Sequence, residues 1–172
     1  MARLIGEGRV RKILCSFARS SGSVLFEEVY ARGAIELEIV PQGTMAERMR
    51  AAAAGIPAFY TATGAGTKLA EGKEARIFNG REYILEHAIY GDVALVEAWR
   101  ADRWGNLVYR DAGRNFNPVM AAAAELTIVQ TQHVAELGEL SPEEIATPGI
   151  YVNRLVHVAS GDPPLKELVP QT

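Results

Sequence analysis

Apolar and polar residues alternate over the first forty positions at two spacings, and each spacing predicts one kind of element. Residues 10–17 (VRKILCSF) form a short, mostly apolar and partly β-branched run, which predicts a strand. Residues 23–31 carry apolar side chains at helical spacing, and Gly33 follows where such a helix would end. In residues 34–40 (AIELEIV) apolar and acidic residues alternate strictly, so we expect a strand with one buried face.

Two turn signals in the middle of the chain predict hairpins. Asn79-Gly80 separates two alternating stretches, which is a strong signal for a two-residue hairpin turn. Residues 93–99 (VALVEAW) are nearly all apolar and predict a buried strand, and Gly105-Asn106 predicts a second hairpin behind it.

The last third of the chain predicts one more helix and two more strands. Asn117 is expected as the N-cap and Pro118 as the first residue of a helix over residues 117–124. Residues 126–130 and 150–158 are apolar enough to form strands. Because helices alternate with short apolar strands, we expect a parallel-sheet α/β domain with helices on both faces and the hairpins as insertions.

Composition excludes several classes of protein. A length of 172 residues fits one compact domain, and no apolar run approaches the roughly 18 residues that a membrane span needs. The net charge is -3 and the basic residues are scattered, so we expect no nucleic-acid partner. Cys15 is the only cysteine and no secretory leader pattern precedes it, which favours a reducing, cytoplasmic location.

A helix start in the first half of the chain marks a candidate ligand site. Thr44 and Glu47 have the spacing of a capping box, which predicts a helix beginning at residue 44 and ending before Gly55. Gln42 and Gly43 would then lie in the turn between a strand end and a helix N-terminus. Open α/β sheets bind ligands at such turns, where helix amides favour negative charge.

A glycine loop follows that helix at residues 61–67 (TATGAGT). Gly64 and Gly66 have no side chains that would keep a ligand away from the backbone, and Thr63 offers a hydroxyl group. The alternative is that the loop is only a turn. Leu69 stands where the dinucleotide motif has its third glycine, and the chain has no P-loop motif, so neither nucleotide fold is indicated.

Five blocks of sequence, in this order, resemble the alpha (A) subunit of the family I coenzyme A transferases: VPQGTMAERMR, GIPAFYTATGAGT, GDVALVEAWRADRWGNLVYR, RNFNPVMAAAAE and SPEEIATPGIYVNRLV. The resemblance runs from about residue 10 to residue 158. It implies a three-layer parallel-sheet domain over residues 1–159, followed by a loose tail at residues 160–172.

The sequence departs from this family in two places. Such subunits usually begin with a further strand-helix-strand portion that holds a GGFG-like segment, so we expect an N-terminally truncated domain. Relatives also have Gly-Gly where this chain has Ala52 and Ala53, which would alter the approach of the loop to coenzyme A.

The resemblance implies a ping-pong transfer of coenzyme A with no other cofactor. The nucleophilic glutamate of the family belongs to a beta subunit, so we expect a hetero-oligomer that takes acyl-CoA and carboxylate substrates. Glu82, Glu86 and Glu97 are expected to be solvated carboxylates rather than nucleophiles.

Gln42 resembles the family's glutamine that helps to form the oxyanion hole. Its side-chain amide donates two hydrogen bonds and carries no charge. The alternative is a glutamine that only satisfies the turn. We expect contacts to substrate or coenzyme A from seven further residues: Gly43, Thr44, Gly55, Thr63, Gly64, Gly66 and Asn115.

The remaining polar and aromatic residues have ordinary structural interpretations. Asn117 is expected as a helix cap and Phe116 in the core, whereas Trp99 and Trp104 fit the core or an interface. The three histidines, His87, His133 and His157, have no metal-ligand spacing, so we expect no metal site. Two other hypotheses stay open: a truncated remnant that folds or assembles without catalysis, and an unrelated carbohydrate-phosphate enzyme that uses the turn at Gly43.

Overall fold

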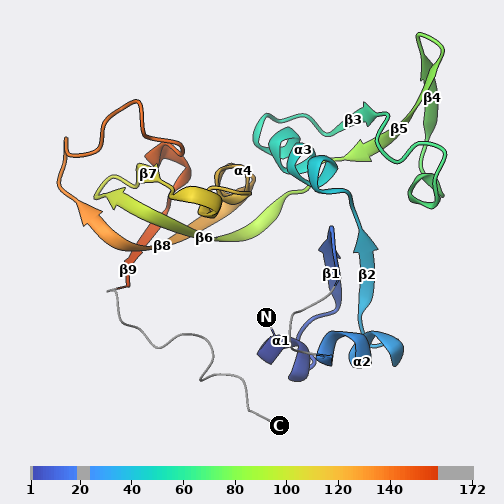
Figure 1. Ribbon diagram of the computed structural model, residues 1–172, viewed down its shortest axis with the longest axis horizontal. Coiled ribbons are helices and arrows are strands. Elements are labelled where there is room, and N and C mark those ends of the chain that lie inside the picture. The colour runs from blue at the N-terminus through green and yellow to red at the C-terminus, as the bar shows by residue number, and fades with distance from the viewer. Residues whose placement is uncertain (1, 19–23, 159–172) are drawn as a thin grey trace. The chain divides into compact units, whose positions relative to one another are not determined.

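The computed structural model describes residues 2–18 and 24–158, which form two compact units (Figure 1). The first unit contains the described residues up to 45 together with residues 60–85. The second contains residues 46–59 and 86–158. The predicted tail at residues 160–172 lies outside the described residues.

The first unit opens with a strand-helix-strand arrangement. After a short helix that was not predicted, α1 (Ala2–Gly6), come β1 (Lys12–Cys15), α2 (Leu25–Ala31) and β2 (Glu36–Ile39), and the two strands pair in parallel. The predicted strands and helix are confirmed, although Ser23 lies outside the described residues. Four side chains form the buried core between these elements: Ile5, Phe26, Val29 and Ile35.

The predicted alternation in β2 is only partly realised. Ile35 is buried and Leu37 half-buried, but Ile39 is 39% exposed. On the other face, the Lys12 ammonium group of β1 lies 2.8 Å from a carboxylate oxygen of Glu36 and of Glu38, which offsets one of the two negative charges.

The Asn79-Gly80 hairpin is confirmed. It joins β4 (Ala75–Phe78) and β5 (Arg81–His87), which pair in antiparallel fashion in a sheet with the order β3-β5-β4, where β3 is Ala58–Thr61. Asn79 and Gly80 have φ values of 52° and 75°, as a two-residue turn with the hand of a hairpin requires.

A four-stranded sheet forms most of the second unit. Its order is β7-β6-β8-β9, with β6 (Gly91–Asp102), β7 (Leu107–Val108), β8 (Ala124–Ala135) and β9 (Arg154–His157). The strands β6, β8 and β9 are parallel, and β7 folds back on β6 through the predicted turn at Gly105-Asn106. The parallel-sheet prediction is thus confirmed for this unit.

Helix α4 (Asn117–Ala122) connects β6 and β7 to β8 and covers one face of the sheet. Small residues allow its close approach, because Ala94 and Ala98 of β6 and Ala121 of α4 are all buried in one cluster. Thr127 Oγ1 donates to the Ala121 carbonyl oxygen (2.8 Å), which links the end of the helix to β8.

The prediction that residues 93–99 form a buried strand holds for one face of the strand only. Ala94, Val96 and Ala98 are buried, whereas Val93 is 51% and Leu95 70% exposed. β6 therefore alternates like a strand with one covered face. A correction concerns residues 150–158, because β9 begins only at Arg154, after a 3-10 turn, η3 (Gly149–Tyr151).

A buried carboxylate closes the turn between β6 and β7. Asp102 is 4% exposed, and its oxygens accept hydrogen bonds from the backbone amide of Trp104 (2.9 Å) and from the backbone and side-chain amides of Asn106 (3.0 and 2.7 Å). Asn106 Oδ1 in turn accepts from the Gly149 amide (2.9 Å). Trp104 itself is 63% exposed, so of its two predicted roles, in the core or at an interface, the first does not hold.

We expect Gly149→Ala to lower the free energy of unfolding of this chain by about 1 to 3 kcal/mol, the usual cost of overpacking. A methyl group at this position would collide with the backbone carbonyl of Trp104. Gly113→Ala is the matched control, because nothing lies within 4 Å of its added Cβ and we expect a change within about 0.5 kcal/mol. Urea unfolding measures both variants, and equal stability of the two would contradict the collision.

Candidate functional site

Helix α3 (Gln42–Ala53) carries Gln42 and Gly43 in its first turn. It begins two residues earlier than predicted, because the Pro41 carbonyl oxygen already accepts from the Met45 amide (2.9 Å) and no separate turn follows β2. Both residues are exposed, and nothing lies within 4 Å of a Cβ added to Gly43. The first backbone N–H groups of a helix have no partner inside it, so this turn presents free donors beside the Gln42 amide.

The predicted capping box is wrong. Thr44 is 4% exposed, and its hydroxyl oxygen has no hydrogen-bond partner among the described residues. The Glu47 carboxylate accepts from Arg50 Nε at 2.9 Å instead of turning back to the helix start. Ala52 and Ala53 lie in the last turn of this helix rather than in a loop.

The glycine loop after β3 is held by hydrogen bonds of its own. Thr61 Oγ1 accepts from the Thr63 amide (3.2 Å), and Thr67 Oγ1 donates to the Gly64 carbonyl oxygen (2.7 Å). Gly64 and Gly66 have φ values of 86° and 71°, a region that favours glycine. This backbone requirement explains both glycines without a ligand, and the loop nevertheless leaves Thr63 exposed.

The eight predicted site residues are divided between the two units. Six belong to the first unit, in the α3 turn (Gln42, Gly43, Thr44) and in the glycine loop (Thr63, Gly64, Gly66), and two belong to the second, Gly55 and Asn115. Gly55 ends α3 with φ 71° and donates its amide to the Ala52 carbonyl oxygen (3.0 Å). Asn115 is exposed and has φ 23°, an uncommon value for a residue other than glycine.

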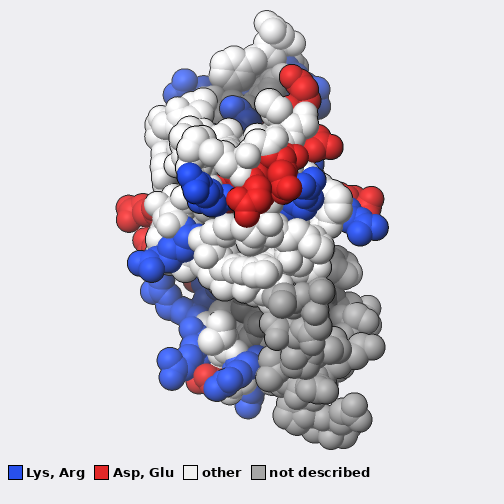
Figure 2. All heavy atoms as spheres, turned by 90° about the vertical axis from the view of Figure 1, so that its left-hand side faces the viewer, with Lys and Arg blue, Asp and Glu red and all other residues white. Residues whose placement is uncertain are grey.

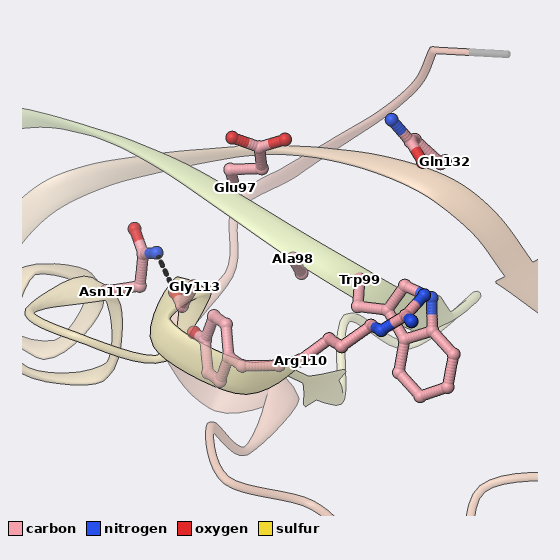
Figure 3. Close-up of a pocket in the computed structure, with 8 residues that line it drawn as sticks. Glu97, Ala98, Trp99, Arg110, Gly113, Asn117 and Gln132 are labelled. Atoms are coloured by element: carbon pink, nitrogen blue, oxygen red, sulfur yellow. Dashed lines mark hydrogen bonds between the residues drawn. The ribbon is translucent and has the colours of Figure 1, made fainter. Parts of the chain in front are cut away.

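A cavity of about 180 Å³ lies in the second unit beside the C-terminal half of β6 (Figure 3). Its wall contains residues from β6, β8, the segment after β7 and the start of α4: Glu97, Ala98, Trp99, Tyr109, Arg110, Gly113, Asn117 and Gln132. Tyr109, Arg110 and Gln132 were not among the predicted site residues. A signal existed for Gln132 alone, because it lies near the carboxyl end of the parallel strand β8.

Asn117 is not the N-cap of α4 as predicted. Phe116, which is half-buried, takes that position, and Asn117 is the first helical residue. Its side-chain Nδ2 donates to the Gly113 carbonyl oxygen (2.6 Å), so it holds the preceding 3-10 turn, η2 (Asp111–Gly113), against the helix.

Aromatic and basic side chains meet at one end of this cavity. The Arg110 Cζ lies 5.6 Å from the centre of the Trp99 ring and the Arg100 Cζ lies 5.9 Å from it. Trp99 is 38% exposed, so it is not the core residue that was one of its two predicted roles. Tyr109 Oη lies 2.8 Å from the buried Thr147 hydroxyl, and burial raises the pKa of the Tyr109 phenol, partly offset by that hydrogen bond.

Glu86 is buried, contrary to the expectation that it is solvated. It is 3% exposed, and its Oε2 lies 3.9 Å from Arg48 Nη1. Arg48 Nε also donates to the His87 carbonyl oxygen (2.6 Å), so the pair joins α3 to the end of β5. Glu82 and Glu97 are exposed, as expected.

Charges of both signs are interspersed on the face shown in Figure 2. Acidic side chains gather in a cluster, and basic side chains lie on either side of it.

Among residues 2–18 and 24–158, no three or more His, Cys, Asp or Glu side chains come together as a metal site would require. Within the same residues no helix is long and apolar enough to cross a membrane.

A family model and curated relatives both relate this chain to coenzyme A transferases. Residues 1–158 match the family model described as Coenzyme A transferase. The chain is 56% identical over 159 residues to the alpha (A) subunit of 3-oxoadipate CoA-transferase from Pseudomonas putida, covering 92% of this chain and 69% of that protein. It is 50% identical over 157 residues to the corresponding subunit of the probable succinyl-CoA:3-ketoacid coenzyme A transferase from Bacillus subtilis, covering 91% and 65%.

Among solved structures, glutaconate coenzyme A-transferase from Acidaminococcus fermentans superposes with a TM-score of 0.81 at 21% identity, covering 93% of this chain and 59% of that chain. At this level of identity the likeness establishes the fold. The chain thus spans about two thirds of the length of these curated relatives and a smaller share of the solved structure.

We expect Tyr109→Phe to weaken the loss of stability at high pH. A phenol whose pKa is raised by folding stabilises the native state below its unfolded pKa, near 10, and this contribution is lost as pH rises through the folded pKa. The variant loses the hydrogen bond to Thr147, at a cost of about 1 kcal/mol near neutral pH, but no longer titrates. Urea unfolding at about pH 8 and pH 10.5 tests this, and an identical pH dependence in both proteins would refute it.

Proposed function

Because this chain belongs to the coenzyme A transferase family, we propose that it is the alpha subunit of an enzyme that moves coenzyme A from an acyl-CoA, such as succinyl-CoA, to a 3-oxoacid or short-chain carboxylate. The proposal rests on sequence identity over more than nine tenths of the chain. The identity is 56% to a 3-oxoadipate CoA-transferase subunit and 50% to a probable succinyl-CoA:3-ketoacid coenzyme A transferase subunit. In this proposal residues 1–159 form the alpha-subunit domain, residues 160–172 are a tail, and the enzyme acts in the cytoplasm.

The proposed reaction is a ping-pong exchange with its nucleophilic glutamate in a beta subunit. That carboxylate attacks the thioester carbonyl and expels the coenzyme A thiolate, which leaves a mixed anhydride. The thiolate then attacks the glutamyl carbonyl, releases the first carboxylate product and forms a glutamyl thioester. The second carboxylate passes through the same steps in reverse, so no oxidant or other cofactor is consumed.

The carboxylates of this chain support a nucleophile on the partner. Glu86 is the buried candidate, but it faces Arg48 and therefore has a partner that stabilises its charge. Glu82 and Glu97 are exposed, and a solvated carboxylate is a weak nucleophile. In this proposal these three glutamates therefore do not supply the attacking group.

Gln42 is the donor that we assign to the oxyanion. It is exposed in the first turn of a 12-residue helix, where the positive end of the helix dipole and the unpaired amides add to its own two N–H groups. A neutral amide stabilises a developing oxyanion without pairing permanently with the attacking carboxylate.

The other proposed contacts use backbone and hydroxyl groups. Gly43 and the Thr44 amide belong to the same helix turn as Gln42, and the exposed Thr63 with Gly64 and Gly66 offers a second set of donors. The proposed contacts in the second unit are Gly55 and Asn115, of which Asn115 is exposed in the segment before α4.

We expect this chain alone to show no transfer of coenzyme A from succinyl-CoA to a 3-oxoacid, and activity to appear when it is assembled with a beta subunit. The reason is that none of the three glutamates considered is an activated carboxylate, because Glu82 and Glu97 are exposed and Glu86 faces Arg48. Thioester exchange followed by chromatography of the acyl-CoA products measures both samples. Robust turnover by the chain alone would contradict the proposal that the nucleophile belongs to the partner subunit.

Gln42→Ala in the assembled enzyme is expected to reduce kcat about 10²- to 10³-fold, the usual cost of removing one oxyanion donor. Gln130→Ala is the matched control, because Gln130 is an exposed glutamine on β8 outside the cavity, and we expect it to keep wild-type turnover. Circular dichroism and gel filtration check folding and assembly. Wild-type turnover of Gln42→Ala would show that the residue is only part of a helix start.

A further inference from the structure

Strand β4 has an open edge. It lies at one end of the sheet order β3-β5-β4 (Figure 1), so among the described residues only its inner edge pairs with another strand. All four of its residues, Ala75–Phe78, are exposed, and the whole strand belongs to the first unit. An open strand edge presents N–H and C=O groups that can pair with a strand of another chain.

The backbone pattern of the hairpin determines which residues face this edge. Phe78 belongs to the hydrogen-bonded pair that closes the two-residue turn. Four residues earlier, the Glu74 carbonyl oxygen accepts from the Leu85 amide (2.8 Å), in phase with that pair. Because hydrogen-bonded and non-hydrogen-bonded pairs alternate along an antiparallel ladder, the backbone groups of Ala75 and Ile77 point outward to the open edge.

The charged side chain that could protect this edge extends back over the sheet instead. Arg76 Nε lies 2.8 Å from the Glu74 carboxylate, and Arg76 Cζ lies 5.2 Å from the centre of the Tyr60 ring, which belongs to β3 on the far side of β5. Natural edge strands are commonly protected by charged side chains. Here the side chain that remains at the edge, on the opposite face from Arg76, is Ile77, which is 74% exposed.

Charge and backbone conformation exclude two ways in which two copies of this edge could pair. A two-fold axis can be centred on residue 75, 76, 77 or 78 of two antiparallel β4 strands. Centring on Arg76 sets two like charges directly opposite each other, which destabilises a strand pair. Centring on Phe78 makes Asn79 the hydrogen-bonding partner of Ile77, but Asn79 has a φ of 52° and does not continue the strand.

Of the two remaining registers, the one centred on Ile77 has the better contacts. It sets two exposed isoleucines against each other as a hydrogen-bonded pair. It also places Arg76 of each copy opposite the partner's Phe78, which is an aromatic ring rather than a second cation. Centring on Ala75 instead sets Ile77 opposite Lys73, whose amide is already donated within the turn before β4.

We propose that a second copy of this chain adds its own β4 to this edge, antiparallel and about a two-fold axis between the two Ile77 residues. Two three-stranded sheets then join into one sheet. A two-fold contact closes on itself, so it gives a dimer rather than a growing chain. Because only one short strand of each copy takes part, the association is weak and reversible. β4 carries none of the proposed contacts to substrate or coenzyme A, so the inference does not rest on the proposed function.

Sedimentation velocity of the chain alone, from about 5 µM to about 500 µM, measures this association. We expect a reversible monomer–dimer equilibrium, and we expect Ile77→Lys, which sets two charges opposite each other, to raise its Kd at least about tenfold. Leu95→Lys is the matched control, because Leu95 is 70% exposed on β6 in the second unit, and it should leave the Kd unchanged.

Circular dichroism checks that both lysine variants are folded. A wild-type chain that stays monomeric at every concentration would overturn the proposal. So would a dimer that Leu95→Lys disrupts as strongly as Ile77→Lys does, because the copies would then meet through the exposed face of β6.

Disulfide cross-linking tests the register. Cys15 is the only cysteine, so Ile77→Cys and Ala75→Cys are each made in a Cys15→Ser background. In the proposed register the two Cα atoms of residue 77 are about 5.5 Å apart, within reach of a disulfide, whereas those of residue 75 are about 14 Å apart. We expect a covalent dimer from Ile77→Cys only. Cross-linking of Ala75→Cys alone, or equal cross-linking of both variants, would overturn the proposed pairing.

Discussion

The buried carboxylate of Asp102 fixes the geometry on which the cavity depends. Its oxygens accept three hydrogen bonds from amide groups. One of these donors is the Asn106 side chain, whose Oδ1 accepts a hydrogen bond from the Gly149 amide. A buried carboxylate tolerates this position only while it is fully hydrogen-bonded, so the turn has one stable conformation. That conformation sets where β7 leaves the sheet, and with it the positions of Tyr109 and Arg110 beside β6.

Packing in the second unit extends this constraint to the rest of the sheet. Thr127, which is fully buried, contacts α4 through its hydroxyl group, and its backbone amide donates to Asn153 Oδ1 (2.7 Å). One threonine therefore joins the helix, β8 and the segment before β9. Since small side chains fill the space under α4, the helix has little freedom to shift, and Asn117 and Gly113 keep their place in the cavity wall.

Local signals were enough to predict elements but not their ends or their partners. The Asn79-Gly80 turn and the second hairpin at Gly105 depend on backbone conformations that neighbouring residues set, and both predictions are confirmed. The predicted start of α3 is wrong because Thr44 has the sequence spacing of a capping residue, but its side chain is buried. The burial of Glu86 depends on Arg48, 38 positions earlier in the sequence, and the cavity joins residues from two strands, a helix and a connecting segment, so no local pattern could reveal either.

The exposure of Gln42 bears on which catalytic groups each subunit contributes in the proposed reaction. An oxyanion donor stabilises charge most strongly where water is excluded, because the solvent otherwise competes for the same charge. In this chain the first turn of α3 is open, and Gly43 beside it leaves room for close approach. A partner that supplied the nucleophile would at the same time cover this turn, so water exclusion and completion of the catalytic groups would occur in one step. The same covering would increase the strength of every hydrogen bond that Gln42 makes, without any new residue from this chain.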